Sequence, residues 1–242
     1  MQLPNLRFWV TTHEPPRTLP PAAFLSLETL RLESVALPWL HFLTSHEEDI
    51  IRNGFTPATL CTNLRETLRF LECPRGTIID STLSSSAANF WNLVGLRVEE
   101  DCFGPEGCIS RLTDNDVENL AVALPRLRNL RLVEPCRFNS CKTTVSSLLS
   151  LSTHCLGLDL LEIHFNTRTI VDDMQRLLDG RFGRDKAKCE LRNLRAGRSP
   201  LEVCRGDIKN IAKGFKVIFP CLDTCSGVGR WYFVHTAFEG LD

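Results

Sequence analysis

One apolar pattern recurs along this sequence and limits what the chain can fold into. The pattern is Leu-x-x-Leu-x-Leu, and it appears eight times with small variations, clearly at Leu27, Leu30 and Leu32. Its middle residues fall at positions 6, 30, 68, 96, 130, 161, 194 and 225. Alternating apolar residues are typical of a short strand with one buried face. Such a strand cannot bury that face alone, but stacked copies can.

The repeats therefore predict an α/β leucine-rich-repeat solenoid. In this fold, a curved parallel sheet lines the concave face, and helices and irregular connectors form the convex face. The separations of 24 to 38 residues mostly exceed the roughly 20–29 of regular repeats, so we expect irregular ones. We assign residues 1–225 to about seven to eight repeats and residues 226–242 to a C-terminal tail or cap.

In that tail we expect aromatic residues to cover the last repeat, namely Trp231, Tyr232, Phe233 and Phe238. Gly227 and Gly229 precede Arg230 without a helix pattern, which argues against a dinucleotide-binding loop.

Helices are predicted in several connectors between the strands. Thr113 to Asp116 has the form of a capping box, and Thr143-Thr144 precedes a second helix. We expect a third helix to start at Thr169 with Asp172, and a fourth to be capped by Asp207. Apolar residues at helical spacing follow each start. The helices therefore alternate with the strands, which predicts βαβ units.

The cysteines indicate a reducing compartment. There are eleven of them in 242 residues, an odd number in a chain too long for a small disulfide scaffold. Their spacing lacks paired Cys-x-x-Cys units, so we expect no metal site. Instead, we assign Cys73, Cys102, Cys136 and Asn166 to the turns that follow strands. The formal net charge is −1, without a spanning apolar run, so we expect a cytoplasmic or nuclear protein that binds neither nucleic acid nor membrane.

Arginine dominates one position of the repeat. The residue between the last two apolar positions points away from the core. In sequence order these residues are Arg7, Arg31, Arg69, Arg97, Arg131, Glu162, Arg195 and Ser226. We expect Glu162, and Glu33 and Glu99 at the next outward position, to neutralise part of the column.

Two interpretations of this column stay open. Arginine stems can simply cover the sheet while their heads are solvated. Alternatively, the column recognises an acidic or phosphorylated protein segment, because arginine binds carboxylate and phosphate through two parallel hydrogen bonds. The candidate partner-binding residues are Arg31, Arg69, Arg97, Arg131, Glu162 and Arg195.

Motifs for catalysis are missing from the sequence. It contains no Gly-x-Ser-x-Gly, no His-Glu-x-x-His and no phosphate-binding loop. We therefore assign no catalytic, cofactor-binding or metal-binding residues, and we expect a binding protein rather than an enzyme.

From about Phe24 to Leu222, the sequence resembles the repeat region of fungal F-box proteins with leucine-rich repeats. The resemblance is carried in order by segments 112–117, 123–127, 135–138, 143–144, 150–155 and 161–167. It implies the substrate receptor of a cullin–RING ubiquitin ligase, whose repeats hold the target while an F-box hairpin docks on the ligase adaptor. No F-box precedes Leu3, so we expect adaptor binding only if an F-box is supplied. The alternative is a stand-alone scaffold or inhibitor that recruits no ligase.

Overall fold

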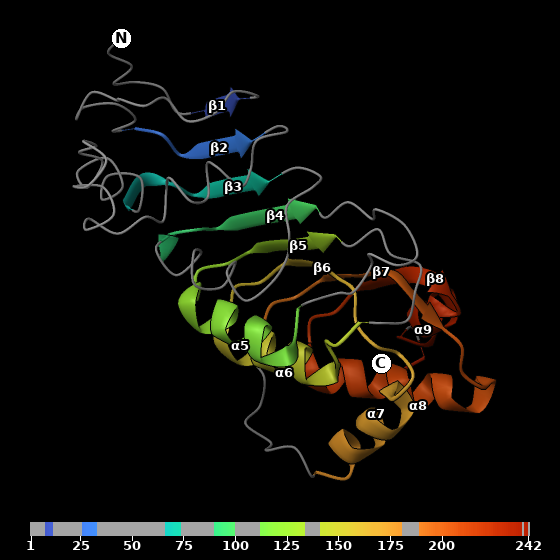
Figure 1. The fold of residues 1–242 in the computed structure, drawn as a ribbon. Coiled ribbons are helices and arrows are strands. Elements are labelled where there is room, and N and C mark those ends of the chain that lie inside the picture. Colours follow the sequence, from blue (N-terminus) through green and yellow to red (C-terminus); the bar gives the residue numbers. More distant parts are fainter. Residues whose placement is uncertain are drawn as a thin grey trace.

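A single parallel sheet organises the molecule. The computed structural model describes residues 8–11, 26–32, 66–73, 90–99, 112–133, 141–180, 189–238 and 240–241. Within these ranges, eight strands form one sheet, whose order follows the chain from β1 to β8 (Figure 1). All neighbouring pairs are parallel. The predicted α/β class with a parallel sheet is therefore confirmed.

The strands are short, apart from β7. They span Phe8–Thr11 (β1), Thr29–Leu32 (β2), Phe70–Cys73 (β3), Gly95–Glu99 (β4), Asn129–Val133 (β5), Leu160–Ile163 (β6), Asn193–Leu201 (β7) and Thr224–Gly229 (β8).

Helices follow the later strands and pack against one face of the sheet (Figure 1). They span Asp114–Ala123 (α5), Val145–His154 (α6), Ile170–Leu178 (α7), Arg205–Ile218 (α8) and Trp231–Phe238 (α9). We call the opposite face of the sheet the open face. In the described part of the chain, no helix combines the length and apolar character needed to cross a membrane.

The repeat leucines build the core between the sheet and the helices. The middle position of each copy is almost completely buried in the six strands from β2 to β7, as at Leu30, Leu96 and Leu130. The helices add their own apolar faces, including Val117, Leu120 and Ala121 of α5. Complete burial of such a side chain contributes about 1.5–3 kcal/mol. The stacked leucines are thus the main source of stability.

The predicted start of α5 is confirmed by its capping contacts. Thr113 Oγ1 accepts a hydrogen bond from Asp116 N at 3.3 Å, and Asp116 Oδ2 accepts one from Thr113 N at 2.9 Å. The next helix, α6, begins as predicted after Thr144, whose Oγ1 accepts a hydrogen bond from Ser146 N at 3.1 Å. The Asp114 carboxylate accepts hydrogen bonds from Thr144 N and Thr144 Oγ1, both at 2.7 Å, and from Ser147 Oγ. This carboxylate therefore joins two repeats.

Two other helix starts differ in detail from the prediction. Thr169 precedes α7, yet its hydroxyl donates to Asp173 Oδ2 at 2.8 Å rather than to Asp172. Asp207 does not cap α8, because the helix begins at Arg205 with Cys204 as its N-cap residue. Asp207 lies in the first turn, where a negative charge still favours the helix dipole.

The end of the sheet holds a helix that the sequence pattern did not predict. Strand β8 continues to Gly229, across the boundary expected at residue 225, and α9 follows it directly. Trp231, Val234 and Phe238 are buried, because their spacing places them on one helix face. By contrast, Tyr232 and Phe233 are exposed, which differs from the expected covering role.

Trp231 is the anchor of this last helix. Its Nε1 donates to the carbonyl of Ser199 at 2.8 Å, so its polar atom is satisfied despite complete burial. Its ring centroid lies 5.7 Å from that of Phe165 and 5.8 Å from that of Phe215. The ring thus fixes α9 to both β7 and α8.

Candidate functional site

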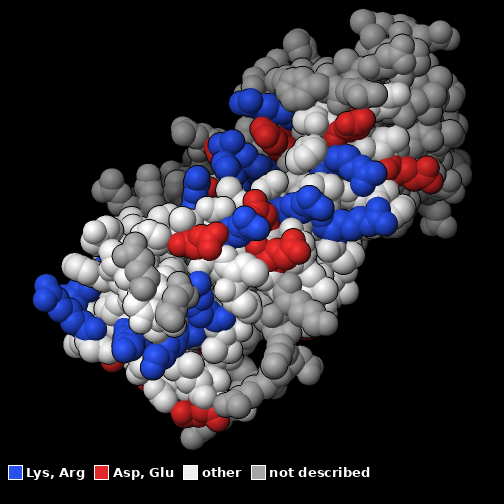
Figure 2. Space-filling view, turned by 180° about the vertical axis from the view of Figure 1, so that it is seen from behind, with Lys and Arg blue, Asp and Glu red and all other residues white. Residues whose placement is uncertain are grey.

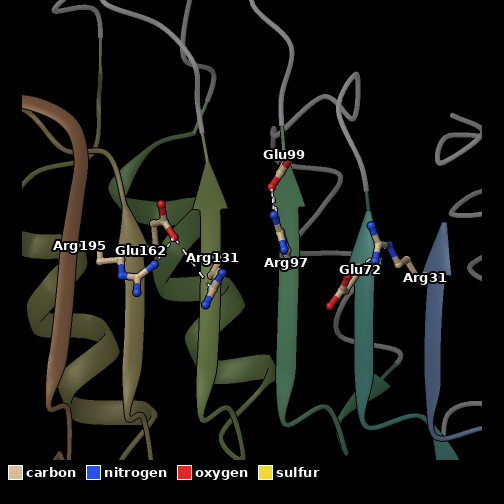
Figure 3. Close-up of polar contacts among 7 residues, drawn as sticks. All are labelled: Arg31, Glu72, Arg97, Glu99, Arg131, Glu162 and Arg195. Atoms are coloured by element: carbon tan, nitrogen blue, oxygen red, sulfur yellow. Dashed lines mark hydrogen bonds and ion pairs between the residues drawn. The ribbon is translucent and has the colours of Figure 1, made fainter. Parts of the chain in front are cut away.

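The open face carries one charged residue from each of six neighbouring strands. The strand register aligns these positions directly. We call this set the charged row; it consists of Arg31, Glu72, Arg97, Arg131, Glu162 and Arg195 (Figure 3). Figure 2 shows that positive and negative side chains are interleaved on this side of the molecule.

The structure corrects the predicted column at two strands. Arg31 pairs with Glu72 of β3, so Glu72 takes the position assigned to Arg69. Arg69 instead precedes β3, where its carbonyl accepts hydrogen bonds from Val94 N and Gly95 N. In β1 the residue opposite Arg31 is Val10 rather than Arg7, which lies outside the described residues. The row is therefore a mixture of charges and not a nearly continuous stripe of arginines.

Ion pairs neutralise much of the row. Arg31 Nε lies 3.6 Å from Glu72 Oε2, while Glu162 Oε2 lies 4.0 Å from Arg131 Nε and 3.9 Å from Arg195 Nη1. The predicted neutralising roles of Glu99 and Glu162 are thus confirmed; Glu33 lies outside the described residues.

Arg97 forms the tightest of these pairs. Its Nε donates to Glu99 Oε1 at 2.9 Å, and its Nη2 contacts the same oxygen. The pKa of the Arg97 guanidinium is raised above its ordinary value, mainly by this hydrogen bond to Glu99. The guanidinium is therefore both fixed in place and permanently charged.

One junction in the row places like charges side by side. Arg97 and Arg131 are direct register partners on β4 and β5, whereas every other neighbouring pair in the row joins an arginine to a glutamate. Neighbouring strands lie about 4.8 Å apart, and like charges directly opposite each other are unfavourable. An anion placed at this junction would relieve that repulsion.

The same junction lies in a groove of about 370 Å³ on the open face. The groove is lined by Phe70, Leu71, Glu72, Gly95, Leu96, Arg97, Asn129 and Arg131. The Phe70 ring covers the backbone of Gly95 and remains 40% exposed. The groove therefore combines an aromatic surface with two guanidinium groups and one carboxylate.

Hydrogen bonds between the turns that precede β3, β4 and β5 hold the three strands of the groove in position. Asn92 Nδ2 donates to the carbonyl of Glu66 at 3.0 Å, and Asn92 Oδ1 accepts from Arg126 Nη1 at 2.7 Å. These residues lie in the turns that lead into β3, β4 and β5. The Arg126 guanidinium also lies over the exposed Trp91 ring, 5.3 Å from its centroid. A single buried amide therefore aligns the strands that carry the groove.

The repeat pattern did not predict this groove, although one feature of the sequence points to it. The repeat pattern with Leu68 in the middle puts Phe70 at the last apolar position and therefore in the core, whereas the structure leaves it 40% exposed. An aromatic residue opposite a glycine on the next strand is the pattern that could have revealed it, because only a bare backbone accommodates a ring at that distance.

The cysteines contribute to the core rather than to a site. Cys73 does not lie in a turn but in β3, where it pairs with Val98 at the last apolar position of the repeat. Asn166 follows β6 as predicted and accepts a hydrogen bond from Arg168 N at 3.0 Å. Cys102 and Cys136 lie outside the described residues.

Burial removes the reactivity of several thiols. Burial raises the pKa of Cys73 and Cys155 to about 12 and that of Cys189 to about 11. Since the thiolate is the nucleophilic form, these thiols are inert at neutral pH. Among the described residues, no three His, Cys, Asp or Glu side chains come together as a metal site would require.

The groove presents three kinds of contact to a ligand. It offers fixed positive charge for an anion, an amide at Asn129 for a further hydrogen bond and an aromatic surface for an apolar group. Comparison with known proteins adds no assignment: no protein-family model matches this chain, and no curated protein has a matching sequence.

Proposed function

We propose that this chain is a leucine-rich-repeat protein-binding module that holds its partner on the open face. The regular succession of parallel strands, with helices on the opposite face, supports this assignment. Solenoids of this kind present extended surfaces to which a partner can dock across several strands. The charged row runs along such a surface, and its side chains reach solvent.

The Arg97–Arg131 junction is the observation that carries the proposal. It is the part of the row where positive charge is not interrupted by a carboxylate, and it coincides with the groove. Arg97 and Arg131 have ion-pair partners in Glu99 and Glu162, but elsewhere in the row each arginine lies directly beside a glutamate on the neighbouring strand. We therefore expect the partner to contribute an acidic or phosphorylated residue at this junction, and mixed or uncharged residues on either side.

The role inherited with the resemblance is selection of ubiquitin-ligase substrates. The segments that carry the resemblance overlap parts of α5, α6 and β6, which belong to the buried framework. In that role the repeats bind the target, and a separate F-box hairpin recruits the ligase. The module would act in the cytoplasm or nucleus, a compartment in which free cysteines such as Cys204 and Cys221 stay reduced.

Affinity purification with matched variants tests the proposal. We expect wild-type protein to retain a partner that both Arg97→Glu and Arg131→Glu lose. Truncating one member of a buried charged pair costs about 2–5 kcal/mol, which is enough to lose a micromolar complex. The control is Arg176→Glu on α7, an equal change of charge at a side chain that is 59% exposed.

Thermal unfolding must first show that the variants are folded. If all three then retain the same partners as the wild type, the open face is not the binding surface. Copurification of a cullin–RING adaptor with the partner supports the ligase role. A partner retained without any adaptor supports the scaffold or inhibitor instead.

A further inference from the structure

The groove between β3 and β5 has features that a simple acidic-segment surface would not need. Phe70 presents an aromatic ring that is 40% exposed, although burial of large aromatic side chains is favourable. The ring lies over Gly95, so it forms the apolar surface next to the arginine junction. The groove can therefore contact an apolar group of a ligand as well as its charge.

The two arginines differ in how they can contact a ligand. Arg97 uses Nε and Nη2 to bind Glu99, so it supplies mainly a fixed positive charge. Arg131 lies 4.0 Å from the nearest Glu162 oxygen, too far for a hydrogen bond. Arg131 is therefore the principal donor to an anion in the groove.

Several charges lie in or beside the groove. Arg97 and Arg131 contribute two positive charges, and Glu72 contributes one negative charge that is shared with Arg31. Glu99 and Glu162, which do not line the groove, pair with Arg97 and Arg131 respectively. A doubly charged anion between the two guanidinium groups attracts them more strongly than a singly charged carboxylate does. Arginine also matches the geometry of a phosphate through parallel hydrogen bonds.

We propose that this groove is a subsite for an aryl phosphate, such as the side chain of a phosphotyrosine in a bound protein segment. The aromatic ring of the ligand packs against Phe70, while its phosphate accepts hydrogen bonds from Arg131 next to Arg97. This subsite deepens the proposed function and rests on the open face being the binding surface. The ring of the ligand distinguishes it from phosphoserine or glutamate, which would not use Phe70.

Titration with phenyl phosphate tests the subsite directly. Binding is followed through the Arg Nε–H resonances of labelled protein, and inorganic phosphate and benzoate serve as comparison probes. We expect phenyl phosphate to bind at least about fivefold more tightly than either probe, because it alone offers both the ring and the dianion. Equal affinity for phenyl phosphate and inorganic phosphate would overturn the proposal.

Three variants test the subsite: two should weaken the binding of phenyl phosphate and one should strengthen it. Arg131→Gln should weaken phenyl phosphate about tenfold, as expected for a lost hydrogen bond to a charged group. Phe70→Ala should reduce phenyl phosphate to the affinity of inorganic phosphate. Glu72→Gln should strengthen binding, because it removes a negative charge from the groove. An unchanged affinity in Arg131→Gln, or weaker binding in Glu72→Gln, contradicts the assignment, and Arg176→Gln serves as the control.

Failure of the aryl phosphate subsite can be distinguished from failure of the proposed function. If Arg97→Glu and Arg131→Glu lose a protein partner but phenyl phosphate does not bind, the aryl phosphate subsite is wrong and the open face remains the binding surface. If phenyl phosphate binds as described while no open-face variant affects partner binding, the proposed function is wrong.

Discussion

The ring of Phe70 lies so close to Gly95 that a Cβ at position 95 would be 2.5 Å from Phe70 Cδ1. Strand register places the two residues side by side on β3 and β4. The glycine therefore determines where the ring lies, and with it the shape of the groove.

Gly95→Ala should displace this ring. Because the Phe70 side chain is partly exposed, it can rotate toward solvent, and we expect a loss of about 1–2 kcal/mol in the free energy of unfolding. Urea denaturation measures the change. In a Phe70→Ala background the same substitution should cost clearly less, since the clash is gone. Strictly additive effects would mean that the two residues do not interact.

Asp114→Ala should destabilise the protein by about 2–3 kcal/mol. The substitution leaves Thr144 N, at the N-cap of α6, and the hydroxyl of buried Ser147 without their acceptor. Glu118→Ala, at an exposed position of the same helix, is the control and should change stability by about 0.5 kcal/mol or less. Equal effects of the two substitutions in urea unfolding would show that these contacts between repeats contribute nothing.

Gly197→Ala should be more damaging than either. Gly197 has a φ of +56°, and an added Cβ would lie 2.1 Å from ring atoms of His164. Backbone strain and the steric overlap together should cost about 2–4 kcal/mol. In a His164→Ala background only the strain of about 1–2 kcal/mol should remain.

Gly206→Ala is the matched control for that experiment. Nothing lies within 4 Å of its added Cβ, so the change should be neutral or stabilise α8 by up to about 1 kcal/mol. A similar loss at both glycines would indicate a general sensitivity of the fold and not a local one.

The buried thiols make stability depend on alkaline pH. Burial raises the pKa of Cys73 from its ordinary value of 9.0 to about 12, so the unfolded chain releases this proton at lower pH than the folded chain does. The stabilising effect is complete below pH 9 and is lost as the pH rises toward 12. At pH 10 the loss is about 1.4 kcal/mol for each such thiol.

The Cys73→Ala variant isolates this effect. Its destabilisation relative to wild type should shrink by about 1.4 kcal/mol between pH 8 and pH 10, because the variant has no thiol to titrate. Cys221→Ala, at an exposed position, should show no such change. A difference between wild type and Cys73→Ala that is independent of pH would contradict the raised pKa.

The sequence predicted β2 and β4 to β8 in the correct register, but the predictions for β1 and β3 were wrong by three residues each. The first two leucines of the pattern are three residues apart, so a shift of three still places a leucine on a leucine position. The pattern predicts Leu68 as the middle residue of its repeat, whereas Leu71 occupies that position in the structure. Helices α5 to α8 precede β5 to β8, and the predicted register of these four strands was correct.

That error changed the chemistry of the candidate site more than the fold. Leucines still occupy the core positions of β3, but Glu72 stands in the row where the pattern predicts Arg69. The expected row of arginines is therefore a row of mixed charges. The groove depends on contacts between neighbouring strands, such as Phe70 with Gly95, which are defined only once the register is known. Sequence periodicity predicts which residues face outward, whereas their neighbours depend on the pairing of separate repeats.

The order of the strands bears on how the chain assembles during synthesis. Each strand from β2 onward joins an edge made by residues that precede it, so a strand leaving the ribosome finds its neighbour already present. Asp114 of α5 is likewise already synthesised when Thr144, at the start of α6, donates its N–H to the Asp114 carboxylate. Growth from the N-terminal side, one repeat at a time, therefore needs no distant segment to arrive before a repeat can settle against its predecessor.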